Sequence, residues 1–142
     1  MNARLNLAVR EKYGLAYTID SQYSPYTDTG LFSIYFGTEK KYIDKTTKLV
    51  LQELRKLRDV KLNSGQLRST KEQLKGQLAM SEENNNGFML MMAKSILDLG
   101  MVESLESIFT RIDNITAEDI QRVASEMFNE DQLNYLIFEP EK

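Results

Sequence analysis

Apolar residues near the start of the chain follow first a helical and then a strand-like pattern. Leu5, Val9 and Tyr13 recur at every fourth position, which predicts a helix that ends at Gly14. Directly after this glycine, over residues 15–23, apolar and polar residues alternate as in a strand with one buried face. The residues expected on that apolar face are Leu15, Tyr17, Ile19 and Tyr23.

A second strand is predicted at residues 31–36, where Leu-Phe-Ser-Ile-Tyr-Phe is rich in residues that favour strands. Residues 24–30, between the two strands, contain the turn-forming types Pro, Asp and Gly. The two strands are therefore expected to form an antiparallel hairpin. Gly37 and Thr38 are expected to end it and to lead into a helix.

Helical patterns dominate the middle of the chain. Residues 39–60 carry the clearest of them, with apolar side chains at a period of about 3.6 between lysines and glutamates. Asn63-x-x-Gln66 has the form of a capping box and predicts the start of the next helix. That helix is expected to break or kink in the polar stretch at residues 82–87, and a helical stripe then resumes up to Gly100.

Two shorter helices and a final strand complete the expected order of elements. Ser104 is expected to open one helix and Thr116-x-x-Asp119 the next, before a strand at residues 133–138. This order indicates an α+β fold, with an antiparallel or mixed sheet and helices packed on one face. Since three strands are few for so many helices, we expect residues 1–142 to form a single, incomplete domain that is cut on its N-terminal side.

Composition and charge bound the class of protein. The 142 residues suffice for one domain with a core. The formal net charge of -3 and isoelectric point near 5.1 give no electrostatic reason to expect binding to nucleic acid, which favours a basic surface. No apolar run approaches the roughly 20 residues of a membrane helix, so no membrane partner is expected.

The chain contains neither histidine nor cysteine. Histidine is the commonest general base near neutral pH, and both residue types are usual ligands of zinc. A standard zinc site and a Ser-His or Cys-His catalytic pair are therefore excluded within this chain. Any hydrolytic activity would require a second polypeptide segment.

Arg10 and Tyr17 are the candidate functional residues, because the predicted turn from helix to strand brings them to one corner. In one interpretation, Arg10 is a last-turn cation that binds helix carbonyls, and Tyr17 is a half-buried strand aromatic. In the other, the guanidinium and the phenol donate hydrogen bonds to a substrate carbonyl or to developing oxyanion charge. The spacing alone favours the first interpretation.

Four strings occur in order along the chain. Arg-Glu-Lys-Tyr-Gly-Leu-Ala-Tyr at residues 10–17 precedes Gly-Leu-Phe-Ser-Ile-Tyr-Phe-Gly-Thr at residues 30–38. Lys-Glu-Gln-Leu-Lys-Gly follows at residues 71–76, and Ile-Thr-Ala-Glu-Asp-Ile at residues 115–120. Together they resemble the insulinase/pitrilysin family of zinc peptidases, which includes the mitochondrial processing peptidases.

The resemblance implies a half-enzyme built from two related α+β domains. One domain carries the motif H-x-x-E-H, in which two His and a distal Glu bind zinc and the motif Glu activates water. The partner domain contributes an arginine and a tyrosine that contact the substrate, and these correspond to Arg10 and Tyr17 here. This segment would then hold no catalytic or metal-binding residue, and zinc would lie in the catalytic domain of the parent protein. Because the strands that precede this region in the family are missing, Met1 is expected to be an internal position of a longer protein.

Three functions are compatible with these features. The first is the C-terminal domain of a zinc metalloendopeptidase, which supplies substrate contacts to an upstream or separate catalytic domain. The second is a non-catalytic structural or assembly subunit of the same family. The third is a peptide-binding α+β module that uses an exposed sheet edge. For the isolated chain, an unpaired strand edge predicts self-association or strand exchange.

Overall fold

The computed structural model describes residues 3–82 and 85–139. The chain divides into two compact units: unit 1 comprises residues 1–60 and 122–142, and unit 2 comprises residues 61–121. Helices combined with an antiparallel sheet confirm the predicted α+β class. The assignment of the whole chain to a single domain stays a prediction.

Unit 1 begins with a helix that contains a π-helical segment, η1 (Asn6–Glu11). The Lys12 N–H donates to the Leu7 carbonyl at 3.0 Å, the five-residue step that defines a π-helix. Gly14 ends the helix with a φ of +60°, in the left-handed region that favours glycine. The predicted helix end is confirmed, whereas the four-residue spacing did not predict the wider π turns.

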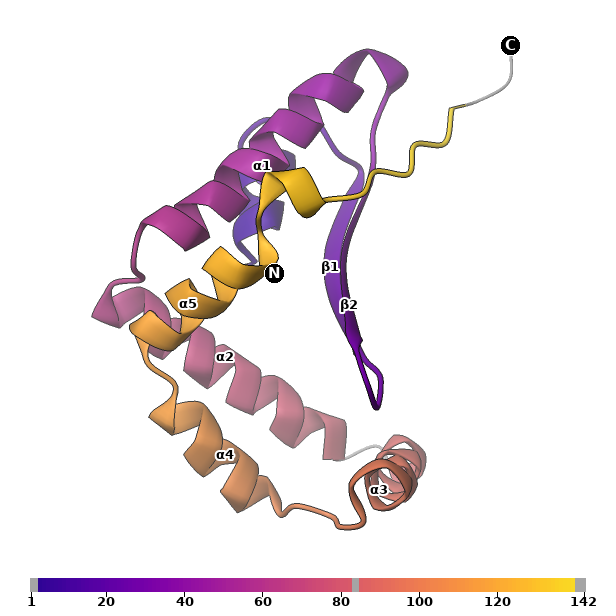
Figure 1. Ribbon diagram of the computed structural model, residues 1–142, viewed down its shortest axis with the longest axis vertical. Coiled ribbons are helices and arrows are strands. Elements are labelled where there is room, and N and C mark those ends of the chain that lie inside the picture. The colour runs from indigo at the N-terminus through magenta and orange to yellow at the C-terminus, as the bar shows by residue number, and fades with distance from the viewer. Residues whose placement is uncertain (1–2, 83–84, 140–142) are drawn as a thin grey trace. The chain divides into compact units, whose positions relative to one another are not determined.

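The strands β1 (Thr18–Pro25) and β2 (Gly30–Gly37) form the predicted antiparallel hairpin (Figure 1). Their register places Ile19 opposite Phe36. Residues that lie opposite each other share one face of the sheet, and both of these side chains belong to the core of unit 1. Among the described residues, the sheet consists of these two strands.

Helix α1 (Ile43–Asp59) packs against η1 and the hairpin, after a short 3-10 segment, η2 (Lys40–Tyr42). The apolar positions of α1 lie on one face, as its periodicity predicted. This packing joins the start of the hairpin to the longest helix of unit 1. The buried core of the unit consists of Val9, Leu15, Ala16, Ile19, Val50 and Leu54.

Unit 2 is helical throughout its regular structure. Its helices are α2 (Ser64–Glu82), α3 (Asn85–Leu99), α4 (Leu105–Asn114) and the first part of α5 (Ala117–Met127), which continues into unit 1. The predicted break at residues 82–87 coincides with the end of α2 and the start of α3, although Glu83 and Asn84 lie outside the described residues. None of the helices in the described ranges is long and apolar enough to cross a membrane.

Side-chain caps confirm the predicted helix starts. Asn63 and Gln66 form a reciprocal capping box, with N···O distances of 2.9 and 3.1 Å. Thr116 and Asp119 do the same at 2.9 and 3.1 Å. The Ser104 hydroxyl accepts a bond from a backbone N–H of the first turn of α4 at 3.2 Å. These short polar patterns satisfy backbone donors that would otherwise lack a partner.

The strand predicted at residues 133–138 does not form, so this prediction was wrong. After a 3-10 turn, η3 (Glu130–Gln132), the chain continues without regular secondary structure through residues 133–138, shown in yellow in Figure 1. A strand needs a second strand to pair with its backbone N–H and C=O groups. In the described parts of the chain, no segment pairs with residues 133–138.

Candidate functional site

The candidate site is the corner where η1 ends and β1 begins. The Gly14 N–H donates to the Arg10 carbonyl at 2.9 Å, and the Leu15 N–H donates to the Val9 carbonyl at 3.1 Å. These bonds satisfy carbonyls at the end of the helix. Leu15 and Ala16 follow at once and are only 7% and 6% exposed, so the corner is fixed in the core of unit 1.

The end of the hairpin holds this corner from a second side. The Thr38 hydroxyl donates a short hydrogen bond to the Leu15 carbonyl, and the Tyr17 N–H donates to the Gly37 carbonyl at 2.9 Å. The sequence strings at residues 10–17 and 30–38 therefore form one structural feature. Its first string supplies the exposed side chains, and its second holds the backbone of the first in place.

Tyr17 points to solvent, with 69% of its surface exposed. The prediction that it shares a buried face with Ile19 was wrong. The corner buries two consecutive residues, Leu15 and Ala16, and the pleat of β1 begins only at Thr18. The exposure also contradicts the interpretation of Tyr17 as a half-buried strand aromatic.

The Tyr17 hydroxyl donates to Glu39 Oε1 at 3.3 Å, and the second oxygen of Glu39 lies 2.8 Å from Lys41 Nζ. The hydrogen bond and the charge of Lys41 hold the pKa of Glu39 below its ordinary value, with a smaller contribution from the Tyr17 hydroxyl. The same carboxylate raises the pKa of Lys41. Glu39 therefore remains an ionised acceptor for Tyr17 through the neutral range.

We expect acidification to release Tyr17 from Glu39 only below the ordinary pKa of a glutamate. Because the pKa of Glu39 is lowered in the folded chain, its contribution to stability is present above that range and is lost as pH falls. Carbon-detected NMR titration of the Glu39 carboxyl should show this low midpoint. In Lys41→Gln the midpoint should rise towards the ordinary value, and an unchanged midpoint would show that Lys41 is not the cause.

Arg10 also faces solvent, from the last turn of η1. Its side chain is 51% exposed, and its Nε lies 4.0 Å from Glu11 Oε1, which is a loose surface pair. The backbone N–H groups of Lys12, Gly14 and Leu15 bind the carbonyls at the helix end. In the described chain, Arg10 and Tyr17 form no hydrogen bond or ion pair with each other. Both tips are thus accessible to a third group.

Three residues of this corner were not identified from the sequence. Thr38 was assigned only to the end of the hairpin, and Glu39 and Lys41 only to the start of a helix. Glu39 lies 22 positions from Tyr17, so no local pattern links the two residues. The available signal was that Thr38 ends the second string and that Glu39 and Lys41 follow directly after it.

The residues present do not fit a zinc site. The sequence has no His and no Cys, and within the described ranges no three Asp or Glu side chains are grouped so that they could hold a metal ion. Oxygen-only ligand sets suit calcium and magnesium better than zinc.

Two lysines of the third string have a structural role in unit 2. Lys71 Nζ donates to the Asp113 backbone carbonyl at 2.8 Å, and Lys75 Nζ lies 2.9 Å from the Asp113 carboxylate. Asp113 is in the last turn of α4, where cations complement the helix dipole. The string at residues 71–76 thus joins α2 to the end of α4.

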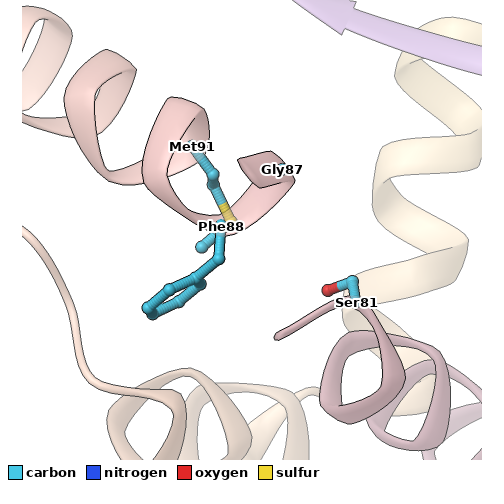
Figure 2. A pocket seen from close by; sticks show the side chains of 4 residues that line it. All are labelled: Ser81, Gly87, Phe88 and Met91. Atoms are coloured by element: carbon cyan, nitrogen blue, oxygen red, sulfur yellow. The ribbon is translucent and has the colours of Figure 1, made fainter. Parts of the chain in front are cut away.

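A hollow of about 250 Å³ in unit 2 is lined by Ser81, Gly87, Phe88 and Met91 (Figure 2). The Ser81 hydroxyl donates to the Leu78 carbonyl at 2.7 Å. The side chains of Phe88 and Met91 are apolar.

A second hollow, of about 140 Å³, lies in unit 1 between the hairpin and α1. The nearly buried Glu53 lines it, with Oε1 2.5 Å from Lys56 Nζ. The rings of Phe32 and Phe128 meet beside it at 5.3 Å between centroids. Glu53 already has a cation partner, so we assign this hollow to packing.

The fold and site together define a chain of the α+β class with a solvent-facing Arg and Tyr corner. A chain of Complex III2 from Candida albicans, solved with Inz-5 bound, has the same fold, with a TM-score of 0.78 at 22% identity. The match covers 89% of this chain and 30% of that chain. The family model described as the Peptidase M16 inactive domain matches residues 1–74. The chain belongs to the M16 peptidase family, which confirms the resemblance to insulinase-type enzymes.

The curated relatives of this chain include bacterial proteins that are named uncharacterized zinc proteases. YmxG of Bacillus subtilis is 34% identical over 137 residues, which are 96% of this chain and 34% of the relative. SCO5738 of Streptomyces coelicolor is 31% identical over 89% of this chain and 28% of its own length. A relative from Rickettsia felis is 33% identical over 91% of this chain and 31% of its own length. The chain thus spans about a third of the length of these relatives.

Proposed function

We propose that the chain presents Arg10 and Tyr17 to a peptide substrate and acts together with a catalytic H-x-x-E-H zinc domain on the same or another polypeptide. The observation that carries this proposal is the 69% exposure of Tyr17 on a corner that is otherwise held rigidly. A tyrosine that served only the core would be covered. Membership of the M16 family and similarity to proteins named zinc proteases support the peptide as ligand.

The two side chains suit the recognition of a peptide backbone. The Arg10 guanidinium donates several hydrogen bonds in a planar fork and keeps its charge at all physiological pH values. The Tyr17 phenol adds one donor and an aromatic face. Both groups can donate to a peptide carbonyl, and their bonds strengthen as negative charge develops on its oxygen. They position and polarise a substrate, while activation of water falls to the other domain.

The corner is organised in advance for this task. The carbonyl of Leu15 and the N–H of Tyr17 are both bound by the end of the hairpin, at Thr38 and Gly37. Little backbone entropy is then lost when a peptide binds. Glu39, which is itself paired with Lys41, accepts the hydrogen bond of the Tyr17 hydroxyl in the free chain, and a substrate carbonyl can replace Glu39 as this acceptor.

The expected result of Arg10→Ala is a loss of peptide affinity, or of cleavage when the zinc domain is present, of about ten- to hundredfold, which is typical of a lost charge-assisted hydrogen bond. Tyr17→Phe should cost less, because the phenol is neutral. Binding of extended peptides to the chain can be measured by isothermal titration calorimetry. Cleavage can be measured with a fluorogenic peptide and the chain assembled with its H-x-x-E-H domain.

Two control variants make the same chemical changes at exposed positions outside the corner. Arg68→Ala removes an exposed arginine of unit 2, and Tyr26→Phe removes an exposed hydroxyl from the hairpin turn. Both should leave binding and cleavage unchanged. If Arg10→Ala and Tyr17→Phe behave like these two controls, the corner does not contact substrate.

A second candidate is a non-catalytic assembly subunit. The observation in its favour is the similarity to a chain of Complex III2, together with the lack of His and Cys. The two candidates differ in what accompanies the chain. A sequence encoding H-x-x-E-H upstream, or in a neighbouring reading frame, favours the peptidase. Peptide turnover that is indifferent to Arg10 and Tyr17, with intact binding to a protein partner, favours the assembly subunit.

A further inference from the structure

Residues 10–17 and residues 37–45 lie side by side at the corner of unit 1. A backbone hydrogen bond of 2.9 Å joins the two segments at Tyr17. At their other end, Lys45 Nζ lies 6.0 Å from the centre of the Tyr13 ring. We call the two segments together the seam, which has one exposed tyrosine at each end.

The seam is positively charged, although the chain as a whole has a formal net charge of -3. Its two segments contain five lysine and arginine residues and three aspartate and glutamate residues. Lys40 is paired with Glu139, at 2.5 Å between Nζ and Oε2, and an excess of positive charge remains. Such an excess favours an anionic ligand over a cationic one.

At the Tyr17 end of the seam, the charges are balanced within the chain. Lys41 Nζ lies 2.8 Å from one oxygen of Glu39, and the other oxygen accepts from the Tyr17 hydroxyl. A further carboxylate at this end would have to share Lys41 with Glu39. The Tyr17 end is therefore better suited to the neutral carbonyl of a peptide backbone.

At the Tyr13 end, two lysines meet without a carboxylate. Lys12 Nζ lies 5.3 Å and Lys45 Nζ 6.0 Å from the centre of the Tyr13 ring, so one ring attracts a cation from each segment. Within the described parts of the chain, neither lysine forms an ion pair. Glu11, which precedes Lys12, lies 4.0 Å from Arg10 Nε instead. Because Tyr13 is 45% exposed, this positive end is open to solvent.

Helix electrostatics explain only one of the two lysines. Lys12 follows the last turn of η1, where a cation complements the helix dipole. Lys45 lies in the first turn of α1, where the dipole disfavours a cation. The position of Lys45 beside Lys12 therefore costs electrostatic energy in the free chain, and a bound carboxylate would offset this cost.

We propose that the Tyr13 end binds an acidic side chain of the peptide whose backbone is bound at Arg10 and Tyr17, with Lys12 and Lys45 as the residues that determine this specificity. The inference rests on the proposed function, because it takes the peptide to lie along the seam. Four residues of chain span at most about 14 Å, which is the limit on the distance between the two tyrosines. The acidic residue is therefore expected within about four positions of the residue bound at Tyr17.

The test compares peptides that differ in a single charge. The probe is a neutral, valine-rich peptide, synthesised with Glu or with Gln at each position in turn, and binding to the chain is measured by isothermal titration calorimetry. At a position that reaches the Tyr13 end, the Glu peptide should bind about three- to tenfold more tightly than its Gln counterpart, as expected of exposed charge pairs. This ratio should fall as the salt concentration rises.

Substitution of the two lysines locates the contact. Lys12→Gln combined with Lys45→Gln should bring the ratio close to one. Lys94→Gln, at an exposed lysine of α3, is the matched control and should keep the ratio. A ratio of one in the unaltered chain at every position would overturn the proposal. So would a ratio that survives the double substitution, or one that is lost in Lys94→Gln.

Arg10→Ala separates this inference from the proposed function. If the corner binds the peptide backbone, Arg10→Ala weakens both the Glu and the Gln peptides. A chain that responds in this way but shows no preference for Glu contradicts the acidic specificity alone. A chain that is indifferent to Arg10→Ala contradicts the proposed function and, with it, the placement of the peptide along the seam.

Discussion

Replacing Leu54 with alanine is expected to lower the free energy of unfolding by about 2–5 kcal/mol. Leu54 is 6% exposed and lies in the core of unit 1 together with Val9, Ile19 and Val50. Truncation of Leu54 weakens the packing of α1 against η1, the hairpin and the corner. It also enlarges the hollow that Leu54 already lines, and cavity volume adds to the cost. Urea denaturation followed by circular dichroism measures the loss.

The matched change is Leu97→Ala. Leu97 is also a helical leucine, but it is 84% exposed on α3, so its truncation should change stability by less than about 0.5 kcal/mol. The contrast between the two variants tests whether the core assigned to unit 1 carries its stability. Equal effects at the two positions would contradict that core.

Features that depend on neighbouring residues were predicted well from the sequence. The capping pairs Asn63/Gln66 and Thr116/Asp119 satisfy helix N–H groups within one turn, so the pattern and the geometry span the same few residues. The helix end at Gly14 is equally local, because it depends on the φ of +60° at this one residue. The hairpin was predicted from alternation before a turn and from strand-favouring residues after it.

Features that depend on distant partners were predicted poorly. Residues 133–138 have the composition of a strand, yet composition does not supply the second backbone that a strand needs. Tyr17 fits the alternation of its neighbours, yet the corner breaks the period by burying both Leu15 and Ala16. Each error arose where the structure depends on residues outside the local pattern.

The candidate site was predicted in part from the sequence. Arg10 and Tyr17 were selected because the predicted turn from helix to strand brings them to one corner, and the resemblance to the peptidase family then favoured a substrate role over the structural role that spacing alone suggested. Their exposure is what the structure adds. Glu39 could not have been chosen as the Tyr17 partner from the sequence, because several carboxylates lie at comparable distances along the chain.

Replacing Thr38 with valine is expected to cost about 1–3 kcal/mol and to loosen the corner that presents Arg10 and Tyr17. The substitution keeps the shape of the side chain and removes the hydroxyl that donates to the Leu15 carbonyl. That carbonyl belongs to a residue only 7% exposed, so water cannot easily replace the lost donor. Urea denaturation gives the loss of stability, and Thr38→Ser should recover much of it.

Thr47→Val is the matched control for this prediction. The Thr47 hydroxyl donates to the Ile43 carbonyl within α1 at 2.9 Å, where a backbone N–H of the helix can serve the same acceptor. Its loss should cost less than that of Thr38. Hydrogen exchange of the Tyr17 amide, which binds the Gly37 carbonyl, should accelerate in Thr38→Val and not in Thr47→Val. If Tyr17 exchange is unchanged while stability falls, Thr38 supports the core without holding the corner.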